Sequence, residues 1–357
     1  EIWKEHFEYH LQHRLRHILT GVSYLGDVTD KTKALVCSMG ERFSSWITTY
    51  ALRKAGIRAE RINAIRLIKT DSNYLDASVN FSNTKSNFTR RVLPLLKKGI
   101  TPVITGFIAK DTHGDITLLG RGGSDYTASI AGICLKAKVI EIWTDVDGIM
   151  SANPKVIPQA KLWPEVSFQV ASEMAHGGAK VLHPRTISPA VENNIPILIK
   201  NTFAPQKPGT RITQKADNGF KGIQMKGGQA IVHLTSTKML DEPGFIKNSA
   251  EIFQQFNTPL DVCTTSEVSV TYSLDEKDLS SKLLRALRRI AHVTLHRNLA
   301  KVTILGENIN RDSKVMATAF TAIQKHRVYI VSMGASNHNI TFLVEEKDAE
   351  GILKKIH

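Results

Sequence analysis

One stretch of the chain reads Thr117-Leu118-Leu119-Gly120-Arg121-Gly122-Gly123-Ser124-Asp125-Tyr126-Thr127-Ala128. Its glycines permit a positive φ and let the backbone approach a ligand without an intervening Cβ. The small, apolar segment that follows predicts a packed helix, whose free N–H groups and positive dipole end favour an anion. Arg121 adds a planar fork suited to a carboxylate or phosphate. A plain helix cap with an exposed Arg121 is the alternative interpretation.

Length and composition indicate an ordinary globular protein with room for two or three domains. The 357 residues are 42% hydrophobic and 22% charged. No apolar run reaches the length of a membrane-spanning helix, and the N-terminus lacks the pattern of a signal peptide. The three distant cysteines, Cys37, Cys134 and Cys263, favour buried thiols in a reducing compartment. We therefore expect a cytoplasmic protein with no membrane partner.

The net charge of +14 and the isoelectric point near 9.6 raise nucleic-acid binding as a hypothesis. The basic residues are scattered, however, and no basic stripe is interleaved with stacking aromatic residues. We rank a nucleic-acid binder last and expect no such partner, and anionic small substrates account for part of the charge. No Cys or carboxylate cluster at ligand spacing supports a metal site at His6, His10 and His13, so these are interpreted as solvated helix histidines and no metal site is predicted.

Strand-like and helix-like segments alternate over residues 1–213. Apolar runs typical of buried parallel strands fall at 101–108, 139–145 and 195–201, with a further strand at 58–64 and helices at 37–55, 87–96, 126–135 and 168–174. This alternation predicts a mainly parallel central sheet sandwiched by helices. Ligands of such sheets bind beyond the carboxyl ends of the strands, where Thr105-Gly106 and Thr144-Asp145 are expected.

The pattern changes after residue 213. Residues 214–228 are predicted to form a linker, and an internal repeat occupies 229–357. A strand at 229–234, a helix at 244–256 and strands at 260–263 and 268–272 recur as 300–306, 314–325, 328–331 and 339–344. Two such βαββ units with trailing helices are ferredoxin-like α/β modules. We predict an α/β catalytic domain over 1–213 followed by these two modules.

The chain resembles the aspartokinases, which belong to the amino-acid kinase family. The resemblance runs from about residue 30 to the end and rests on ordered motifs: SMGER, VITGFI, LGRGGSDYTA, TDVDGI, HGGAKVLHP, IKNT, GTRIT, TTSEVSV and MGASNHN. The SNHN ending and the monofunctional layout are most similar to the lysine-sensitive class. The resemblance implies the amino-acid kinase fold followed by paired regulatory ACT domains.

The resemblance also implies a reaction and its residues. L-Aspartate would be bound by Glu41, Arg121, Gly122, Gly123 and Ser124, with Asp125 and Lys180 as catalytic residues. ATP, with Mg²⁺, would be held by Thr144, Asp145, Met150, Lys155, Lys180 and Val181. The β-carboxylate of aspartate would attack the γ-phosphoryl of ATP to give 4-phospho-L-aspartate and ADP, the first step of lysine, threonine and methionine biosynthesis. Because a carboxylate is already an ionised nucleophile, catalysis reduces to positioning and charge neutralisation.

Feedback inhibition by L-lysine is a further implication of the resemblance. The implied contacts lie in the first ACT module of a homodimer and are Met239, Asp261, Thr265 and Glu267. The two acids would pair with the ammonium groups of lysine. The alternative is that both carboxylates are simply solvated.

The sequence also departs from the family's pattern. Members carry a Lys-Phe-Gly-Gly-like loop after an N-terminal strand, and its Lys steadies the transferred phosphoryl, but no such segment occurs in the 357 residues. Met150 stands where many members have Tyr, and Asn153-Pro154-Lys155 replaces Asp-Pro-Arg. We therefore expect these residues alone to phosphorylate aspartate poorly. A second interpretation stays open: an inactive, truncated regulatory protein that dimerises and senses an amino acid through its ACT domains.

Overall fold

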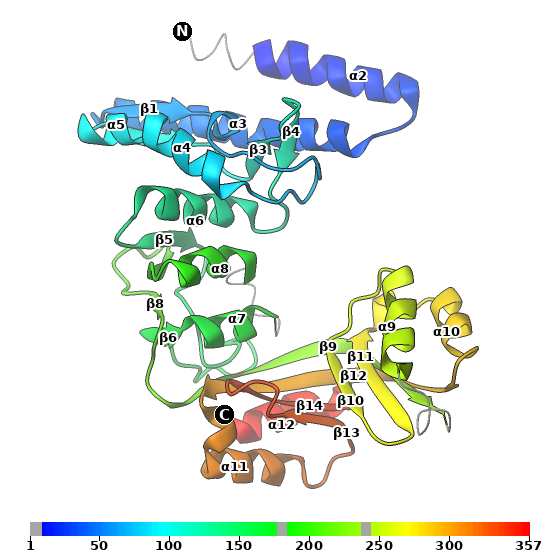
Figure 1. The fold of residues 1–357 in the computed structure, drawn as a ribbon. Helices are drawn as coiled ribbons and strands as arrows, with labels where there is room; N and C mark the ends of the chain where they lie inside the picture. The colour runs from blue at the N-terminus through cyan, green and yellow to red at the C-terminus, as the bar shows by residue number, and fades with distance from the viewer. Residues whose placement is uncertain (1–8, 177–183, 237–243) are drawn as a thin grey trace. The chain divides into compact units, whose positions relative to one another are not determined.

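The computed structural model describes residues 9–176, 184–236 and 244–357 (Figure 1). These residues divide into two compact units. The first comprises 9–146, 184–207 and 211–214, and the second comprises 147–176, 208–210, 215–236 and 244–357. Each unit has its own hydrophobic core. Among the described residues, no helix combines the length and apolar character needed to cross a membrane.

Helices make up much of the first unit. They are η1 (Tyr9–Leu15), α2 (Arg16–Leu25), α3 (Asp30–Lys54), α4 (Phe81–Arg91), α5 (Leu93–Lys97), α6 (Gly123–Leu135) and α8 (Pro184–Glu192), with a short helical turn at Ala64–Arg66. Helix α3 begins seven residues before the predicted start at Cys37, because the side chain of Thr29 accepts a hydrogen bond from the Thr32 N–H and caps it. The other predicted helices of this unit are present with shifted ends, except that the helix predicted at 87–96 is divided at Val92 into α4 and α5.

Two strand pairs of the first unit are parallel, as the alternating pattern predicts, and one is antiparallel. Strand β1 (Ala59–Ile62) lies beside β2 (Thr101–Ile104), and β5 (Ile140–Thr144) lies beside β7 (Ile197–Asn201), both parallel. The apolar run 101–108 is not one strand, however. Phe107 has a φ of 66°, and the chain turns there into β3 (Ile108–Lys110), which pairs antiparallel with β4 (Ile116–Leu118). Two further short strands are β6 (Glu165–Ser167), which belongs to the second unit, and β8 (Thr210–Thr213), of which 211–213 belong to the first.

The second unit contains a six-stranded antiparallel sheet in the order β10-β11-β9-β12-β14-β13. Its strands are β9 (Gly219–Thr235), β10 (Val262–Thr265), β11 (Ser269–Asp275), β12 (His292–Glu307), β13 (Val328–Met333) and β14 (Asn339–Glu345). Its helices are α7 (Phe168–His176), α9 (Phe245–Gln255), α10 (Ser281–Leu287), α11 (Ser313–Ile323) and α12 (Glu346–Ile356). The predicted βαββ repeat is confirmed, since β9-α9-β10-β11 and β12-α11-β13-β14 follow the same order.

The predicted linker is wrong over most of its length. Strand β9 begins at Gly219 rather than at residue 229, and residues 219–226 pair with β12, for example Ile223 with Ile304. Ile223 is fully buried, and Phe220 and Met225 pack against the same core. The backbone of this segment pairs with β12, and its apolar side chains are covered by the core, so the segment is a strand. The domain boundary itself stays a prediction.

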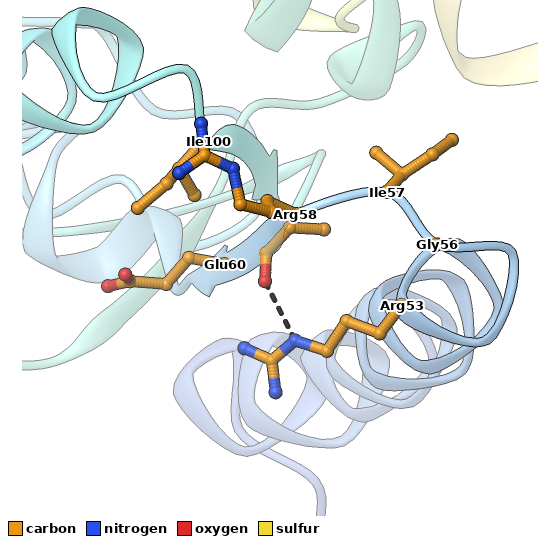
Figure 2. A pocket seen from close by; sticks show the side chains of 7 residues that line it. Arg53, Gly56, Ile57, Arg58, Glu60 and Ile100 are labelled. Atoms are coloured by element: carbon orange, nitrogen blue, oxygen red, sulfur yellow. Dashed lines mark hydrogen bonds between the residues drawn. The ribbon is translucent and has the colours of Figure 1, made fainter.

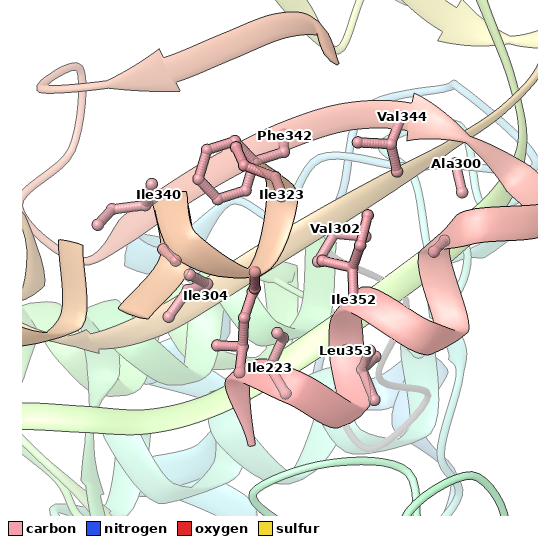
Figure 3. Packing of buried hydrophobic residues seen from close by; sticks show 14 of the residues in the cluster. Ile223, Ala300, Val302, Ile304, Ile323, Ile340, Phe342, Val344, Ile352 and Leu353 are labelled. Carbon is pink, nitrogen blue, oxygen red and sulfur yellow. The ribbon is translucent and has the colours of Figure 1, made fainter. Parts of the chain in front are cut away.

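Apolar residues from this sheet and its helices form the largest core of the second unit (Figure 3). Ile304 of β12 and Phe342 of β14 pack with Ile323 of α11 and Ile352 of α12. A smaller core joins β9, β11 and α9 through residues such as Phe253 and Tyr272, whose ring centroids lie 4.9 Å apart. Each α/β repeat therefore covers part of the sheet with its own helices.

The cysteines only partly follow their prediction. All three are free thiols, and Cys134 is buried in α6. Cys37 and Cys263 are exposed, so the expectation of three buried thiols is wrong for two of them. Cys37 lies on an outward face of α3, and Cys263 lies on β10, the first strand in the sheet order.

Candidate active site

The turn between β4 and α6 has the backbone that its glycines predict. Gly120 and Gly122 have φ values of 73° and 71°, in the left-handed region that disfavours a side chain. Helix α6 begins at Gly123 with no side-chain cap on its first turn. A Cβ on Gly123 would lie 2.6 Å from Cδ2 of Phe107, so the close packing at this point excludes any larger residue. The Gly123 N–H donates to the Gly120 carbonyl at 3.1 Å, which leaves the N–H groups of Ser124 and Asp125 in the first turn for an anion.

A hydrogen bond joins two of the predicted aspartate-binding residues. The Ser124 hydroxyl, in the first turn of α6, donates to Oε1 of Glu41 on α3 at 2.9 Å, although the residues are 83 positions apart. A cavity of about 310 Å³ at this point is lined by Glu41, Phe107, Gly120, Arg121, Gly122, Gly123, Ser124 and Asp125. The structure therefore brings together all five residues predicted for the substrate, with Asp125 beside them.

Two residues of the cavity were not predicted for the site. Gly120 lies in the quoted stretch, and Phe107 belongs to the apolar run after residue 101, where it resembles any core phenylalanine. Its N–H donates to Thr127 Oγ1 at 3.0 Å, and its carbonyl accepts from the Leu119 N–H at 2.9 Å. These bonds tie the left-handed turn at Phe107 to both ends of the glycine-rich loop. The sequence feature that could have indicated Phe107 is the preceding glycine, Gly106. A Cβ at Gly106 would lie 2.9 Å from Ser124 Oγ, so the backbone there lies against the glycine-rich loop.

The charges of the cavity are of both signs. Arg121 is exposed and Glu41 is partly buried. Burial raises the pKa of the Asp125 carboxyl above its ordinary value. The position of Asp125 in the first turn of α6 opposes that effect, because a carboxylate there interacts favourably with the helix dipole. A substrate with both an ammonium group and a carboxylate can therefore find a partner for each.

Asp125→Asn is expected to stabilise the protein against urea at neutral pH. A buried carboxyl with a raised pKa lowers folding stability once the pH exceeds its unfolded-state pKa, because the folded state disfavours the ionised form. The gain should vanish below about pH 4, where the group is protonated in both states. Urea midpoints between pH 4 and pH 8 measure it, with the exposed Asp217→Asn as the control. An equal gain at all pH values, or a gain in the control, would contradict this origin.

The residues predicted for ATP lie in different parts of the chain. Thr144 ends β5, and its hydroxyl donates to Oδ1 of the exposed Asp145 at 3.1 Å. Met150 and Lys155 belong to the second unit, where Met150 bridges to Leu162. Lys180 and Val181 lie outside the described residues. The structure therefore places Thr144 and Asp145 at a carboxyl strand end, as expected, and leaves the full nucleotide set a prediction.

The residues predicted for lysine lie on the hairpin of β10 and β11, apart from Met239, which lies outside the described residues. Asp261 immediately precedes β10, Thr265 ends it, and Glu267 follows in the exposed turn. The carboxylate of Asp261 is paired with Nζ of Lys301 on β12. The Lys301 side chain is only 7% exposed, and that of Asp261 is 31% exposed. The sequence held a signal for this pair, because Lys301 is the one charged residue in the apolar run 300–306 of β12.

Carboxylates and imidazoles do not gather into a metal centre in the described part of the chain. No group of three or more His, Cys, Asp or Glu side chains is positioned to hold a metal ion among these residues. Asp125 and Asp145 offer carboxylate oxygens, the donor type that Mg²⁺ prefers when it also binds the phosphates of a nucleotide. The residues present therefore fit a magnesium ion that arrives with ATP better than one held by the protein alone.

Comparison with known proteins decides the family. Residues 6–201 match the amino acid kinase family, and residues 302–357 match an ACT domain. The chain belongs to the amino acid kinase family. This kinase is 33% identical over 330 residues to lysine-sensitive aspartokinase 3 of Escherichia coli, covering 90% of the present chain and 73% of the relative. It is 32% identical over 360 residues to the chloroplastic aspartokinase 1 of Arabidopsis thaliana, covering 96% of the chain and 63% of that relative.

Solved structures agree with the sequence comparison. The amino acid kinase resembles E. coli aspartokinase III, crystallised with aspartate and ADP, with a TM-score of 0.83 and 30% sequence identity. The similarity covers 97% of the present chain and 81% of the solved one. Aspartokinases are thus its relatives in both comparisons, and the predicted combination of kinase fold and ACT domain is confirmed. The chain spans less than two thirds of the Arabidopsis relative.

Proposed function

We propose that this protein is an aspartate kinase, which transfers the γ-phosphoryl group of ATP to the β-carboxylate of L-aspartate. The observation that carries the proposal is the hydrogen bond between Ser124 and Glu41 beside the glycine-rich turn. It places an acid, Arg121 and a free helix start around one cavity of about 310 Å³. The aspartokinase of E. coli whose structure is similar was crystallised with aspartate and ADP.

The cavity suggests a role for each group. The guanidinium group of Arg121 binds a carboxylate of aspartate through two hydrogen bonds. The Glu41 carboxylate, which Ser124 positions, accepts hydrogen bonds from the ammonium group of aspartate. The N–H groups at the start of α6 face the charge that develops on the transferred phosphoryl. No base is needed, because the β-carboxylate is already ionised. Mg²⁺, when bound with ATP, supplies neutralisation of phosphate charge.

The nucleotide side of the proposal rests on the family resemblance. Thr144 and Asp145 at the carboxyl end of β5 are proposed to hold ATP. Met150, Lys155, Lys180 and Val181 are proposed to complete its site, with Lys180 beside the phosphates. In this proposal the product, 4-phospho-L-aspartate, enters lysine, threonine and methionine biosynthesis in the cytoplasm.

Glu41→Gln tests the proposed aspartate site. Glutamine keeps an acceptor for the Ser124 hydroxyl but loses the charge that would bind ammonium, so aspartate affinity should fall by about 10–100-fold. Calorimetric titration with aspartate measures it, and the exposed Glu192→Gln is the matched control. Aspartate-dependent ADP release is the second readout. It ranks below calorimetry because no Lys-Phe-Gly-Gly loop occurs in the 357 residues, so turnover is expected to be slow. Failure of the unaltered protein in both assays would contradict the proposed function.

We further propose L-lysine as an allosteric inhibitor and a homodimer formed through the ACT domains. The E. coli relative is named as lysine-sensitive. Asp261, Thr265 and Glu267, with Met239, remain the proposed contacts. Because Asp261 is already paired with Lys301, the ammonium group of bound lysine must share or displace that partner. Calorimetric titration with lysine and sedimentation velocity test the two parts separately.

A further inference from the structure

A second cavity of the first unit is lined mainly by arginines. It has a volume of about 540 Å³ and lies among α3, β1, the turn at Ala64–Arg66 and the end of α4. Four guanidinium groups line it, from Arg42, Arg61, Arg66 and Arg91. None of these residues belongs to the proposed aspartate or nucleotide site.

Arg61 is held rigidly within this cavity. Its Nε donates to Ser45 Oγ at 2.8 Å, and its guanidinium carbon lies 4.6 Å from the ring centroid of Trp46. Its Nη2 is buried and has no hydrogen-bond partner among the described residues. A buried donor without an acceptor is unfavourable by an amount that native proteins rarely tolerate. The geometry therefore leaves one donor of a fixed guanidinium without an acceptor beside a cavity.

The surroundings of Arg61 are positive. Burial, followed by the charges of Arg42 and Arg66, lowers the pKa of Arg61 to about 10. Burial and the charge of Arg14 lower the pKa of Arg42 as well. In the described part of the chain, no carboxylate forms an ion pair with any of the four lining guanidinium groups.

Glu60 also lines the cavity and is the one acid to consider there. It precedes Arg61 on strand β1, and successive side chains of a strand point to opposite faces. Its side chain is exposed. Among the described residues, Glu60 forms no ion pair with any of the four guanidinium groups.

Rigid elements carry the other arginines. Arg42 and Trp46 are four residues apart on α3, so they lie on one face of that helix. Arg66 ends a helical turn that Asn63 fixes, because Asn63 Oδ1 accepts from the Ile65 N–H at 3.2 Å. Arg91 is the last residue of α4. The backbones of the four arginines are thus held by four separate elements, while the side chains of Arg66 and Arg91 are exposed.

A neighbouring cavity shows what satisfied arginines look like in the same region (Figure 2). There, Arg53 Nε donates to the Ala59 carbonyl at 2.7 Å, the dashed line in Figure 2. Arg58 Nη2 donates to the Lys98 carbonyl at 2.8 Å. Backbone oxygens therefore occupy donors of both side chains. At Arg61, Nε donates to Ser45 Oγ, but the buried Nη2 has no acceptor among the described residues.

We propose that the cavity lined by Arg42, Arg61, Arg66 and Arg91 binds a small phosphorylated molecule through its phosphate group. A phosphate has about two negative charges at pH 7 and three strong acceptor oxygens, which suits several converging forks better than one carboxylate does. The indole of Trp46 fixes the plane of Arg61 by a cation–π contact. The volume of about 540 Å³ leaves room for more than the phosphate group alone.

Pyrophosphate is the probe for this site. Titration calorimetry at constant ionic strength should show binding to the full chain, and Arg61→Gln or Arg66→Gln should weaken it by about 10–100-fold. Arg90→Gln is the matched control, because Arg90 neighbours Arg91 on α4 but does not line the cavity. Its affinity should stay within about twofold of the unaltered protein.

Thermal denaturation keeps the test independent of misfolding. Without ligand, Arg61→Gln should melt no lower than the unaltered protein, because it removes a buried charge among like charges. Pyrophosphate should raise the melting temperature of the unaltered protein and of Arg90→Gln but not that of Arg61→Gln. Absence of pyrophosphate binding, or binding within twofold in both cavity variants, would overturn the proposal. Tighter binding of succinate or of a single-stranded oligonucleotide would also overturn it.

Discussion

Replacing Arg121 with lysine should lower kcat/KM for aspartate by about 10²–10³-fold, with little change in ADP affinity. Lysine keeps the positive charge but loses the planar fork that binds a carboxylate through two parallel hydrogen bonds. Arg121 lies beside Gly120 and Gly122, whose left-handed backbone fixes where its side chain starts. The loss should therefore come from geometry, because the net charge is unchanged.

Steady-state kinetics with aspartate and calorimetry with ADP measure the two sides of this prediction. The assay protein must contain the family's Lys-Phe-Gly-Gly loop, so that the chemical step is not already impaired. Arg90→Lys, on an exposed face of α4, is the control and should leave both quantities within about twofold. If aspartate KM and kcat of Arg121→Lys both stay within about twofold, Arg121 does not bind the substrate carboxylate.

The aspartate cavity was predictable from the sequence because its information is local. Glycines at 120, 122 and 123 dictate a turn into a helix, and the structure has that turn. Glu41 came from the family resemblance alone, and its bond to Ser124 places it there. Phe107 was not predicted as a cavity residue, because its position there depends on a positive φ at the end of an apolar run. A hydrophobic pattern carries no information about that backbone angle.

Features that depend on distant partners were not predictable. Residues 219–228 were predicted as linker, and four glycines and two lysines interrupt their apolar positions, yet pairing with β12 makes most of them a strand. The arginine cavity is scattered over fifty positions of sequence and becomes visible only when four elements converge. The positions of the basic residues in the sequence did not explain the net charge of +14. Four of these residues line the arginine cavity.

Removing the carboxylate of Asp261 should destabilise the second unit by about 3 kcal/mol, the scale observed when one partner of a buried ion pair is lost. Asp261→Ala leaves the Lys301 ammonium, which is only 7% exposed, without its counter-charge. Lys301→Met should be milder, because the abandoned Asp261 side chain is 31% exposed and can be solvated. Urea or thermal denaturation of the full chain measures both effects. Glu251→Ala on the surface of α9, where the pair to Lys247 is 3.7 Å long, is the control.

The double variant Asp261→Ala/Lys301→Met decides whether the ion pair causes the loss. Methionine suits a buried strand position, so the double variant should regain most of the stability that Asp261→Ala loses. A double variant no more stable than Asp261→Ala would show that the loss does not come from the ion pair with Lys301. The Lys301→Met variant also distinguishes the structural role of Asp261 from its proposed role in binding lysine. If Asp261 contacts lysine, Lys301→Met should bind lysine more tightly, because the carboxylate no longer has an internal ammonium as a competitor. Unchanged lysine affinity in Lys301→Met would remove Asp261 from the proposed allosteric site while leaving its structural role intact.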